Sequence, residues 1–340
     1  MKAKLDNNKA GYDMNNVGII GTGSYIPSKV ITNSDLENII DTSDEWIVTK
    51  TGIRERHIAA PDEATSDLAT HAAKRAIEDA GVQVHDIDLI IVATSSPDMI
   101  QPSTACLVQN KLLARNVAAF DISAACTGFV YALTVASEMM MGNPHYNHVL
   151  VIGAETYSRI LDWSDRNTCV FFGDGAGAVI LGRVNSPRGI LATNLGADGT
   201  RWDVIQMPAG GSRIPATFDT VINKLHCFRM KGKEIWNFVM EIFPVGIKQI
   251  LEKAEMTLDE IDWVIPHQAN AVMLSAVFAQ NNIPLNKTHF CMQKYGNTSG
   301  ASIPMALDEA IKLEKIKKGH VVLLFGFGGG LSYGNILFRL

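Results

Sequence analysis

Short apolar segments alternate along the chain with longer amphipathic segments. The short segments are apolar throughout and rich in Val, Ile and Leu, which is typical of strands buried on both faces. They lie at Val17–Gly21, Leu89–Thr94, Val117–Ile122, Val149–Gly153, Ala176–Leu181, Ile190–Thr193, Trp263–Ile265 and Val321–Phe325. Apolar positions with a helical period predict helices at Ser66–Ala80, Lys233–Lys253 and Ile303–Glu314. This alternation predicts an α/β protein whose sheets are covered by helices on both faces.

A weak internal repeat divides the chain into two halves. The series Glu78, Ala80, Ile87, Asp88 recurs at a constant offset as Glu252, Ala254, Ile261, Asp262. The same offset places Cys126 opposite Gly300, and turn-forming residues cluster between the halves at Asn185–Gly189. We therefore predict a polar N-terminal extension (1–16), an N-terminal half (17–187) and a C-terminal half (188–340) of similar fold.

Composition excludes several classes of protein. With 47% hydrophobic residues the chain can bury a large core, and its net charge of −5 argues against general nucleic-acid binding. The N-terminal segment is polar and no long apolar run exists, so we expect neither a secretory signal nor a membrane span, and a cytoplasmic location. The five cysteines have no metal-binding spacing, so we expect reduced thiols and no metal.

Cys126 is the first candidate for chemistry. It lies in the small-residue sequence Ala-Ala-Cys-Thr-Gly, between the strand Val117–Ile122 and an apolar helix, Gly128–Met141. A tight turn from strand to helix is a known setting for a nucleophile, and the helix N-terminus favours the thiolate. The alternative is a small buried thiol that serves only packing.

His267 and Asn297 are the next candidates. His267 follows the strand Trp263–Ile265 after Pro266, where that strand ends, and ligands gather where parallel strands end. Asn297 lies in the sequence Gly-Asn-Thr-Ser-Gly, which the internal repeat makes the counterpart of the Cys126 turn. Equivalent turns of two similar halves are expected to meet, which would bring Asn297 close to Cys126. The alternatives are a surface histidine and an ordinary helix cap.

The glycine-rich segment Gly326–Gly330 is the last candidate. It has no Gly-Lys-Ser/Thr and is not a phosphate-binding loop, and Gly21–Tyr25 does not complete a dinucleotide-binding motif. Glycines that follow a buried strand can instead present bare N–H groups to an oxyanion.

Taken together, these motifs resemble the β-ketoacyl-acyl-carrier-protein synthase III family over nearly the whole chain. Besides Ala-Ala-Cys126-Thr-Gly, His267-Gln-Ala-Asn270, Gly-Asn297-Thr-Ser and Phe327-Gly-Gly-Gly330, similar segments are Thr42–Val48, Thr51–Arg56 and Phe172–Gly177. The resemblance implies a thiolase-like fold of two pseudo-twofold-related halves in αβαβα layers, and a homodimer. The set of Cys, His and Asn separates the chain from elongating ketosynthases, which resemble Cys/His/His, and from thiolases, which carry a second cysteine.

The resemblance also implies an acyltransferase reaction. An acyl-CoA primer acylates Cys126, and the N–H groups of Cys126 and Gly329 hold the oxyanion. His267 and Asn297 then stabilise the enolate formed when malonyl-ACP or malonyl-CoA loses CO₂, and the carbanion attacks the acyl group. The residues implied for CoA binding are Trp46, Lys50, Arg54, Arg166 and Asn270. No metal or redox cofactor is implied.

The chain departs from the family at the surface implied to dock the carrier protein, which includes Gln268 and Val272. The positions where the family carries basic residues hold Val272, Ala279, Gln280 and Asn237; Lys224, Lys231 and Lys233 are possible substitutes. Initiation of fatty-acid synthesis is the first interpretation. The alternative is a specialised relative of secondary metabolism with a CoA-borne or small-molecule acceptor. A non-catalytic subunit is disfavoured because Cys126, His267 and Asn297 are all present, and hydrolysis of the acyl-enzyme is a further alternative.

Overall fold

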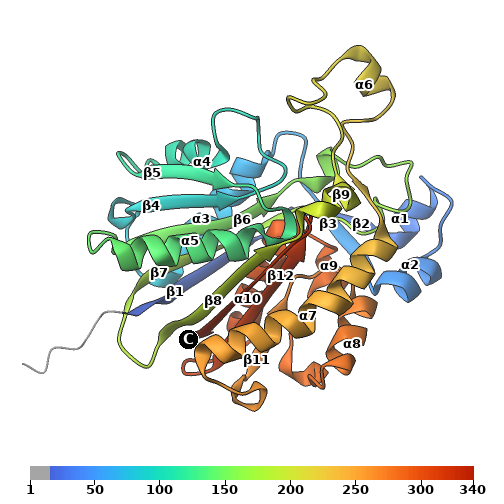
Figure 1. The fold of residues 1–340 in the computed structure, drawn as a ribbon. Coiled ribbons are helices and arrows are strands. Elements are labelled where there is room, and N and C mark those ends of the chain that lie inside the picture. The colour runs from blue at the N-terminus through green and yellow to red at the C-terminus, as the bar shows by residue number, and fades with distance from the viewer. Residues whose placement is uncertain (1–15) are drawn as a thin grey trace, which may run out of the picture.

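The computed structural model describes residues 16–340, and two twisted sheets form its centre (Figure 1). The polar extension predicted for residues 1–16 lies outside the described residues except for Asn16. No helix of the described chain combines the length and the apolar composition that crossing a membrane requires.

The first sheet has five strands in the order β1-β7-β6-β4-β5. They are β1 (Asn16–Tyr25), β7 (Gly175–Val184), β6 (His148–Glu155), β4 (Leu89–Ala93) and β5 (Ala118–Ile122). β7 is antiparallel to both β1 and β6, whereas β4 is parallel to both β6 and β5. The apolar runs of the sequence therefore become strands buried between helices.

The second sheet repeats this arrangement in the order β8-β13-β12-β11. Its strands are β8 (Gly189–Ala197), β13 (Ser332–Arg339), β12 (Val321–Gly328) and β11 (Trp263–Pro266). β13 is antiparallel to β8 and β12, and β12 is parallel to β11, as in the first sheet. The predicted similarity of the two halves is confirmed, and we propose that they divide in the turn between β7 and β8, at residues 187 and 188. β13 was missed by the sequence analysis because it follows the glycine-rich segment directly.

Helices cover the outer faces of the sheets and fill the space between them. α3 (Thr65–Ala80) and α4 (Thr104–Leu112) cover the first sheet, and α7 (Gly232–Ala254) and α8 (Ala271–Gln280) cover the second. α5 (Gly128–Gly142) and α10 (Ser302–Lys312) lie between the sheets. The predicted helices are thus all present, with ends that differ by one or two residues.

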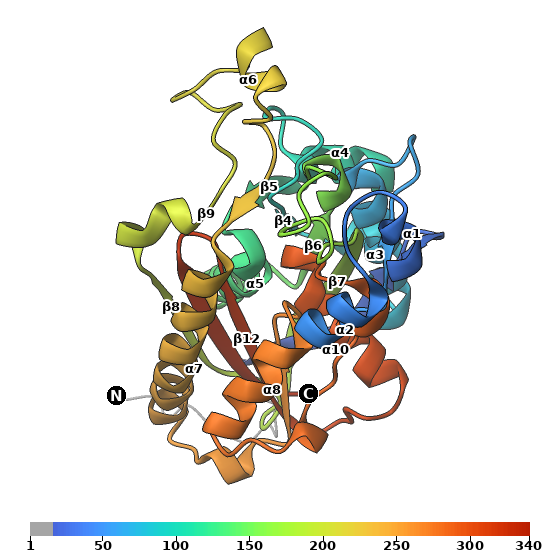
Figure 2. The ribbon, with the colours of Figure 1, turned by 90° about the vertical axis from the view of Figure 1, so that its right-hand side faces the viewer.

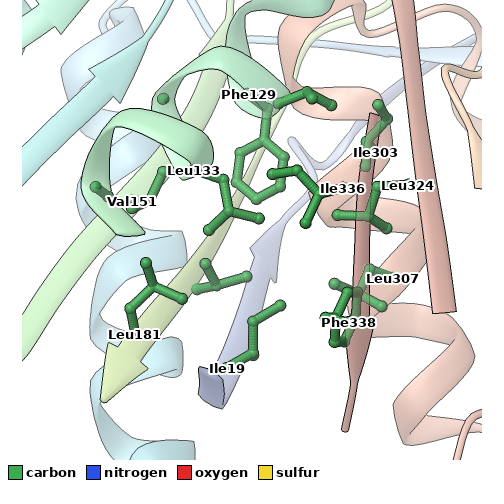
Figure 3. Close-up of a cluster of buried hydrophobic side chains, with 14 of the residues drawn as sticks. Ile19, Phe129, Leu133, Val151, Leu181, Ile303, Leu307, Leu324, Ile336 and Phe338 are labelled. Atoms are coloured by element: carbon green, nitrogen blue, oxygen red, sulfur yellow. The ribbon is translucent and has the colours of Figure 1, made fainter. Parts of the chain in front are cut away.

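The central core joins the two halves. Figure 3 shows Ile19, Phe129 and Leu133 of the first half facing Leu307, Leu324 and Phe338 of the second. These side chains are at most 3% exposed, and burial of each stabilises the fold by about 1.5–3 kcal/mol. The five layers run helix, sheet, helix, sheet, helix, which is the predicted αβαβα architecture.

The remaining elements surround the end of the molecule where the central helices begin. They are β2 (Lys29–Thr32), α1 (Asn33–Glu37), α2 (Asp44–Thr51), β3 (Glu55–Ile58), β9 (Ile205–Gln206), α6 (Phe218–Ile222), β10 (Arg229–Met230) and α9 (Met292–Tyr295). α6 projects from the body in both views (Figures 1 and 2). Phe218 on this helix is 81% exposed.

Candidate active site

Cys126, His267 and Asn297 come together in one cavity of about 230 Å³. They come from three distant parts of the sequence: the turn before α5, the end of β11 and the turn before α10. The cavity is otherwise lined mainly by apolar side chains, including Phe172, Phe228 and Trp236. Polar groups that converge in an apolar cavity are the usual composition of a small-molecule site.

Cys126 is held in a tight turn. The short 3₁₀ helix Ala125–Thr127 leads into α5, and Ala125 has a left-handed backbone with φ 47°. Gly328, at the end of β12, packs directly on this turn, because a Cβ atom added there would lie 2.9 Å from the backbone N of Cys126. Gly329 continues this approach toward Ala125, and its carbonyl accepts a 2.8 Å hydrogen bond from Ser332.

Burial acts on the thiol of Cys126 in the opposite direction to its place before a helix. Burial raises its pKa to about 12, and a hydrogen bond with the Ser299 hydroxyl offsets this only in part. The Sγ and Oγ atoms are 3.4 Å apart. Desolvation therefore opposes the thiolate, whereas the N-terminus of α5 favours it.

His267 is a neutral histidine whose tautomer is fixed by its neighbours. It is 2% exposed, and burial lowers its pKa to about 3. Its Nδ1 lies 2.7 Å from the Ser302 hydroxyl oxygen, which also accepts the backbone N–H of Gln268 at 3.3 Å. Among the described residues, Nδ1 is the acceptor that remains for the Ser302 hydrogen, so the proton of His267 resides on Nε2. His267 therefore offers an N–H donor.

The amide of Asn297 is oriented in the same way. Its Oδ1 accepts the backbone N–H of Ser299 at 2.8 Å. Because a backbone N–H can only donate, this bond identifies the oxygen, and the NH₂ group is left as the donor. The backbone of Asn297 is clamped too, donating to Phe171 and accepting from Gly173.

The two turns meet as the repeat predicts. Ser299 has a left-handed backbone with φ 47°, the value found at Ala125 in the equivalent turn. The predicted closeness of the Asn297 loop to Cys126 is confirmed by the contact between Ser299 and the thiol. A non-glycine residue in this conformation carries strain, which the surrounding packing has to maintain.

The residues implied for CoA binding lie near the α2–α8 side of the cavity. Arg166 stacks on Trp46, with its guanidinium carbon 5.2 Å from the ring centroid, and donates to the Asp41 carbonyl at 2.9 Å. Asn270 lines the cavity, caps α8 through its Oδ1 and donates to the Lys50 carbonyl at 3.0 Å. The amide of Asn270 thus also has a structural role. The Lys50 and Arg54 side chains are exposed.

The expectation that Gln268 takes part in carrier-protein docking is wrong. It is fully buried, its NH₂ group donates to the Pro266 carbonyl at 2.8 Å, and its oxygen accepts the Cys291 N–H at 3.0 Å. A side chain with no exposed surface cannot touch a docked protein. Val272 is 41% exposed on the first turn of α8.

Sequence reasoning missed Ser299, Ser302 and Glu155. Glu155 ends β6 and is fully buried, and burial raises its pKa to about 7. It accepts hydrogen bonds from Ser96 at 2.6 Å and from the backbone N–H of Gly300 at 3.3 Å, so it ties the first half to the Ser299 turn. A carboxylate at the end of an apolar strand was the available signal.

Comparison with known proteins places the chain among condensing enzymes. Residues 120–199 match the family described as 3-oxoacyl-[acyl-carrier-protein (ACP)] synthase III, and residues 251–340 match its C-terminal part. A β-ketoacyl-[acyl-carrier-protein] synthase III of Caldanaerobacter subterraneus subsp. tengcongensis is 52% identical over 322 residues, covering 95% of this chain and 97% of the relative.

Solved structures that resemble this chain support the same family. The 3-oxoacyl-[acyl-carrier-protein] synthase III of Aquifex aeolicus VF5 superposes with a TM-score of 0.87 at 46% identity, covering 95% of this chain and 100% of that chain. The priming β-ketosynthase of the R1128 polyketide pathway superposes with a TM-score of 0.88 at 32% identity, covering 95% and 96%.

Proposed function

The chain belongs to the 3-oxoacyl-[acyl-carrier-protein] synthase III family, and from this premise we propose that Cys126, His267 and Asn297 carry out its reaction. The protein is a condensing acyltransferase of fatty-acid biosynthesis with a thiolase-like fold. Its reaction joins an acyl primer to malonyl-ACP with loss of CO₂. The orientation of the His267 and Asn297 donors, fixed by Ser302 and by the Ser299 N–H, is the observation that carries the assignment.

The first step forms an acyl-enzyme. The sulfur of Cys126 attacks the carbonyl carbon of acyl-CoA, the carbon–sulfur bond to CoA breaks, and CoA leaves as the thiol with the proton of Cys126. The N–H groups of Cys126 and Gly329 hold the oxyanion between attack and departure. Because burial opposes the thiolate in the free site, the proton has to leave as the new bond forms, aided by the N-terminus of α5.

The second step forms the carbon–carbon bond. Nε2–H of His267 and the NH₂ group of Asn297 donate to the thioester oxygen of the malonyl group. As CO₂ leaves, the electron pair of the broken bond enters the enolate, whose charge gathers on this oxygen. The α-carbon then attacks the acyl carbonyl, the bond from that carbon to sulfur breaks, and Cys126 departs as a thiolate that takes up a proton from solvent. A neutral His267 suits this step because its Nε2–H donates a hydrogen bond to the enolate oxygen while the imidazole stays uncharged throughout.

CoA and carrier protein reach the cavity from the side of α2 and α8. Trp46 and Arg166 bind the adenine ring between them, with Lys50 and Arg54 near the phosphates. The guanidinium carbon of Arg166 lies 5.2 Å from the centroid of the Trp46 ring, and this distance has to widen to about 7 Å to admit the adenine ring. For the carrier protein, Lys224 and Lys231 are poor replacements for the missing basic residues, because they pair with Asp162 and Asp203.

The protein acts as a homodimer in the cytoplasm. β5 is the last strand of the first sheet, and its outer edge has no strand partner within the described chain. An edge with free N–H and C=O groups is a template for pairing with the same strand of a second copy. Sedimentation of the purified protein checks this: a monomer at micromolar concentration would contradict the dimer.

Intact-mass measurement tests the reaction. Incubation with acyl-CoA should add one acyl mass, which is absent in Cys126→Ala. A chase with malonyl-ACP should discharge it and yield 3-oxoacyl-ACP, whereas His267→Ala and Asn297→Ala should acylate but not condense. Discharge by malonyl-CoA alone would instead favour a specialised acceptor, discharge to free acid would indicate hydrolysis, and an acyl adduct in Cys126→Ala would refute the nucleophile.

A further inference from the structure

A buried carboxylate, Glu155, lies beside the site where the two halves of the molecule meet. It is the last residue of β6, it is fully buried, and among the described residues its hydrogen-bond partners are all neutral. Burial raises its pKa to about 7, and the hydrogen bonds that it accepts offset this only in part. A buried carboxyl without a cationic partner is costly for stability, so its presence beside a reactive thiol indicates a role beyond packing.

The two carboxylate oxygens divide their hydrogen bonds between the halves. Oε2 accepts the Ser96 hydroxyl at 2.6 Å, the Ser95 and Ser96 N–H groups at 3.0 and 3.1 Å, and the Thr94 hydroxyl at 3.3 Å, all from the segment that follows β4. Oε1 accepts the Ser95 N–H at 3.2 Å and the Gly300 N–H at 3.3 Å. Because Gly300 belongs to the second half, the carboxylate anchors this residue to the end of the first sheet.

Gly300 has no room to move at this position. A Cβ atom added to it would lie 3.0 Å from Oε1 of Glu155 and 3.5 Å from the carbonyl oxygen of Ala125, in the turn before the nucleophile. A Cβ atom added to Gly153 of β6 would collide with the Gly300 carbonyl. The short 3₁₀ helix that begins at Ser299 is therefore held between Glu155, the backbone of β6 and the nucleophile turn.

This held turn makes two contacts with the groups of the site. The hydroxyl of Ser299 lies 3.4 Å from the sulfur of Cys126, and the N–H of Ser299 donates to Oδ1 of Asn297 at 2.8 Å. The second bond fixes which end of the Asn297 amide is left as the donor. If the Ser299–Gly300 peptide shifts, the amide shifts with it, and a misplacement of about 1 Å in a reacting site lowers a rate by about a hundredfold.

We propose that Glu155 is a positioning residue for the condensation step: its bond to the Gly300 N–H holds the Ser299 turn, and through this turn the amide of Asn297, in the productive orientation. This inference rests on the proposed role of Asn297 as a donor to the malonyl thioester oxygen. Glu155 itself acts through the backbone and is not among the residues that line the cavity.

Glu155→Gln tests the proposal, because the amide keeps the shape of the carboxylate but has only one acceptor oxygen. This oxygen should take the place of Oε2, which accepts more and shorter hydrogen bonds than Oε1. The NH₂ group would then face the Gly300 N–H, donor against donor. The substitution therefore breaks the bond to the second half and keeps those within the first.

Single-turnover kinetics measure the consequence. The variant is acylated with acetyl-CoA, which is followed by intact mass, and malonyl-ACP is then added while release of labelled CO₂ is recorded. Release should slow by about tenfold to a hundredfold at saturating malonyl-ACP. The concentration of malonyl-ACP that gives half the maximal rate, and the rate of acylation, should each change by less than about threefold, because the oxyanion-hole N–H groups of Cys126 and Gly329 do not belong to the Ser299 turn.

Asp308→Asn is the matched control. Asp308 of α10 is also fully buried and also links the halves, since it accepts the hydroxyls of Thr22 and Ser24 on β1 at 2.7 and 2.5 Å. It does not line the cavity, so its loss should lower stability while the ratio of the two rates stays as in the wild type. Unchanged CO₂ release in Glu155→Gln, or an equal loss in both steps, would overturn the proposal.

Gly300→Ala is the second variant if Glu155→Gln does not fold. It keeps every polar group but places a Cβ atom 3.0 Å from Oε1, so it pushes the turn away from the carboxylate. It should show the same selective loss of CO₂ release, and unchanged release would overturn the proposal. Normal condensation by Asn297→Ala would instead refute the proposed role of Asn297, and absence of an acyl adduct in the wild type would refute the acylation itself.

Discussion

Replacement of Ser302 by alanine tests whether the tautomer of His267 is set by its neighbour. The Ser302 oxygen lies 2.7 Å from Nδ1, and both residues are at most 2% exposed. Ser302→Ala leaves Nδ1 without a donor in a place that water does not reach. The tautomer protonated on Nδ1 then competes, and this tautomer would aim a lone pair at the thioester oxygen in place of a hydrogen.

The magnitude follows from the broken hydrogen bond. A buried polar atom that loses its partner costs about 1–3 kcal/mol. If that cost is expressed in the decarboxylation step, the rate falls by about fivefold to 150-fold, since about 1.4 kcal/mol corresponds to a factor of ten. Acylation of Cys126 uses the oxyanion hole and not His267, so it should change by less than about threefold.

Single-turnover kinetics separate the two steps. Acylation is followed by quenched-flow mass measurement, and decarboxylation by release of labelled CO₂ from malonyl-ACP. Ser137→Ala is the matched control, because Ser137 is a fully buried serine whose hydroxyl, among residues 16–340, bonds only to the Thr134 carbonyl of its own helix. An unchanged rate of decarboxylation in Ser302→Ala, or an equal loss in both steps, would refute the reasoning.

Three further predictions concern other parts of the site. Below its unfolded pKa near 6.5, His267 takes up a proton in the unfolded chain but not in the fold, where its pKa is about 3. Stability is therefore lost as pH falls, by about 2 kcal/mol between pH 7 and pH 5 from this group, and urea titrations of His267→Gln should show a smaller decrease. Gly328→Ala should slow acylation by about tenfold or more, because its Cβ would lie 2.9 Å from Cys126. Gly142→Ala is the control and should not slow it, because a Cβ there meets no atom of the described residues within 4 Å; equal rates of acylation in the two variants would contradict the packing argument. Trp46→Ala should raise KM for acyl-CoA by about tenfold through loss of stacking, and an unchanged KM in initial-rate measurements would argue against adenine binding there.

Much of this protein is determined locally by its sequence. Apolar runs such as Leu89–Ala93 have no polar position for water, so they are buried, and their short length and β-branched residues favour a strand over a helix. The small residues around Cys126 mark the turn before α5. The repeat predicted that the two halves fold alike, and β6 and β12, with their following strands, take equivalent places in the two sheets. The strand β13 was not predicted, because the adjacent glycines suggested a loop.

The tertiary structure alone decided how these groups act. Gln268 lies in a motif that suggests a surface role, yet its buried side chain forms hydrogen bonds with the backbone of Pro266 and Cys291. The raised pKa of Cys126 results from burial by segments far away in sequence, which opposes the local preference of a helix terminus.

The hydrogen-bond donors of the site show most clearly which features depend on the local sequence and which on the tertiary structure. The sequence determined that a histidine and an asparagine follow the strand and the turn where they are needed, because strand ends and turns are local features. It did not determine which atoms point at the substrate. That depends on single hydrogen bonds from Ser302 and from the Ser299 backbone. A hydrogen bond requires its two atoms to meet within a few tenths of an ångström, and only the packing of both halves brings them there.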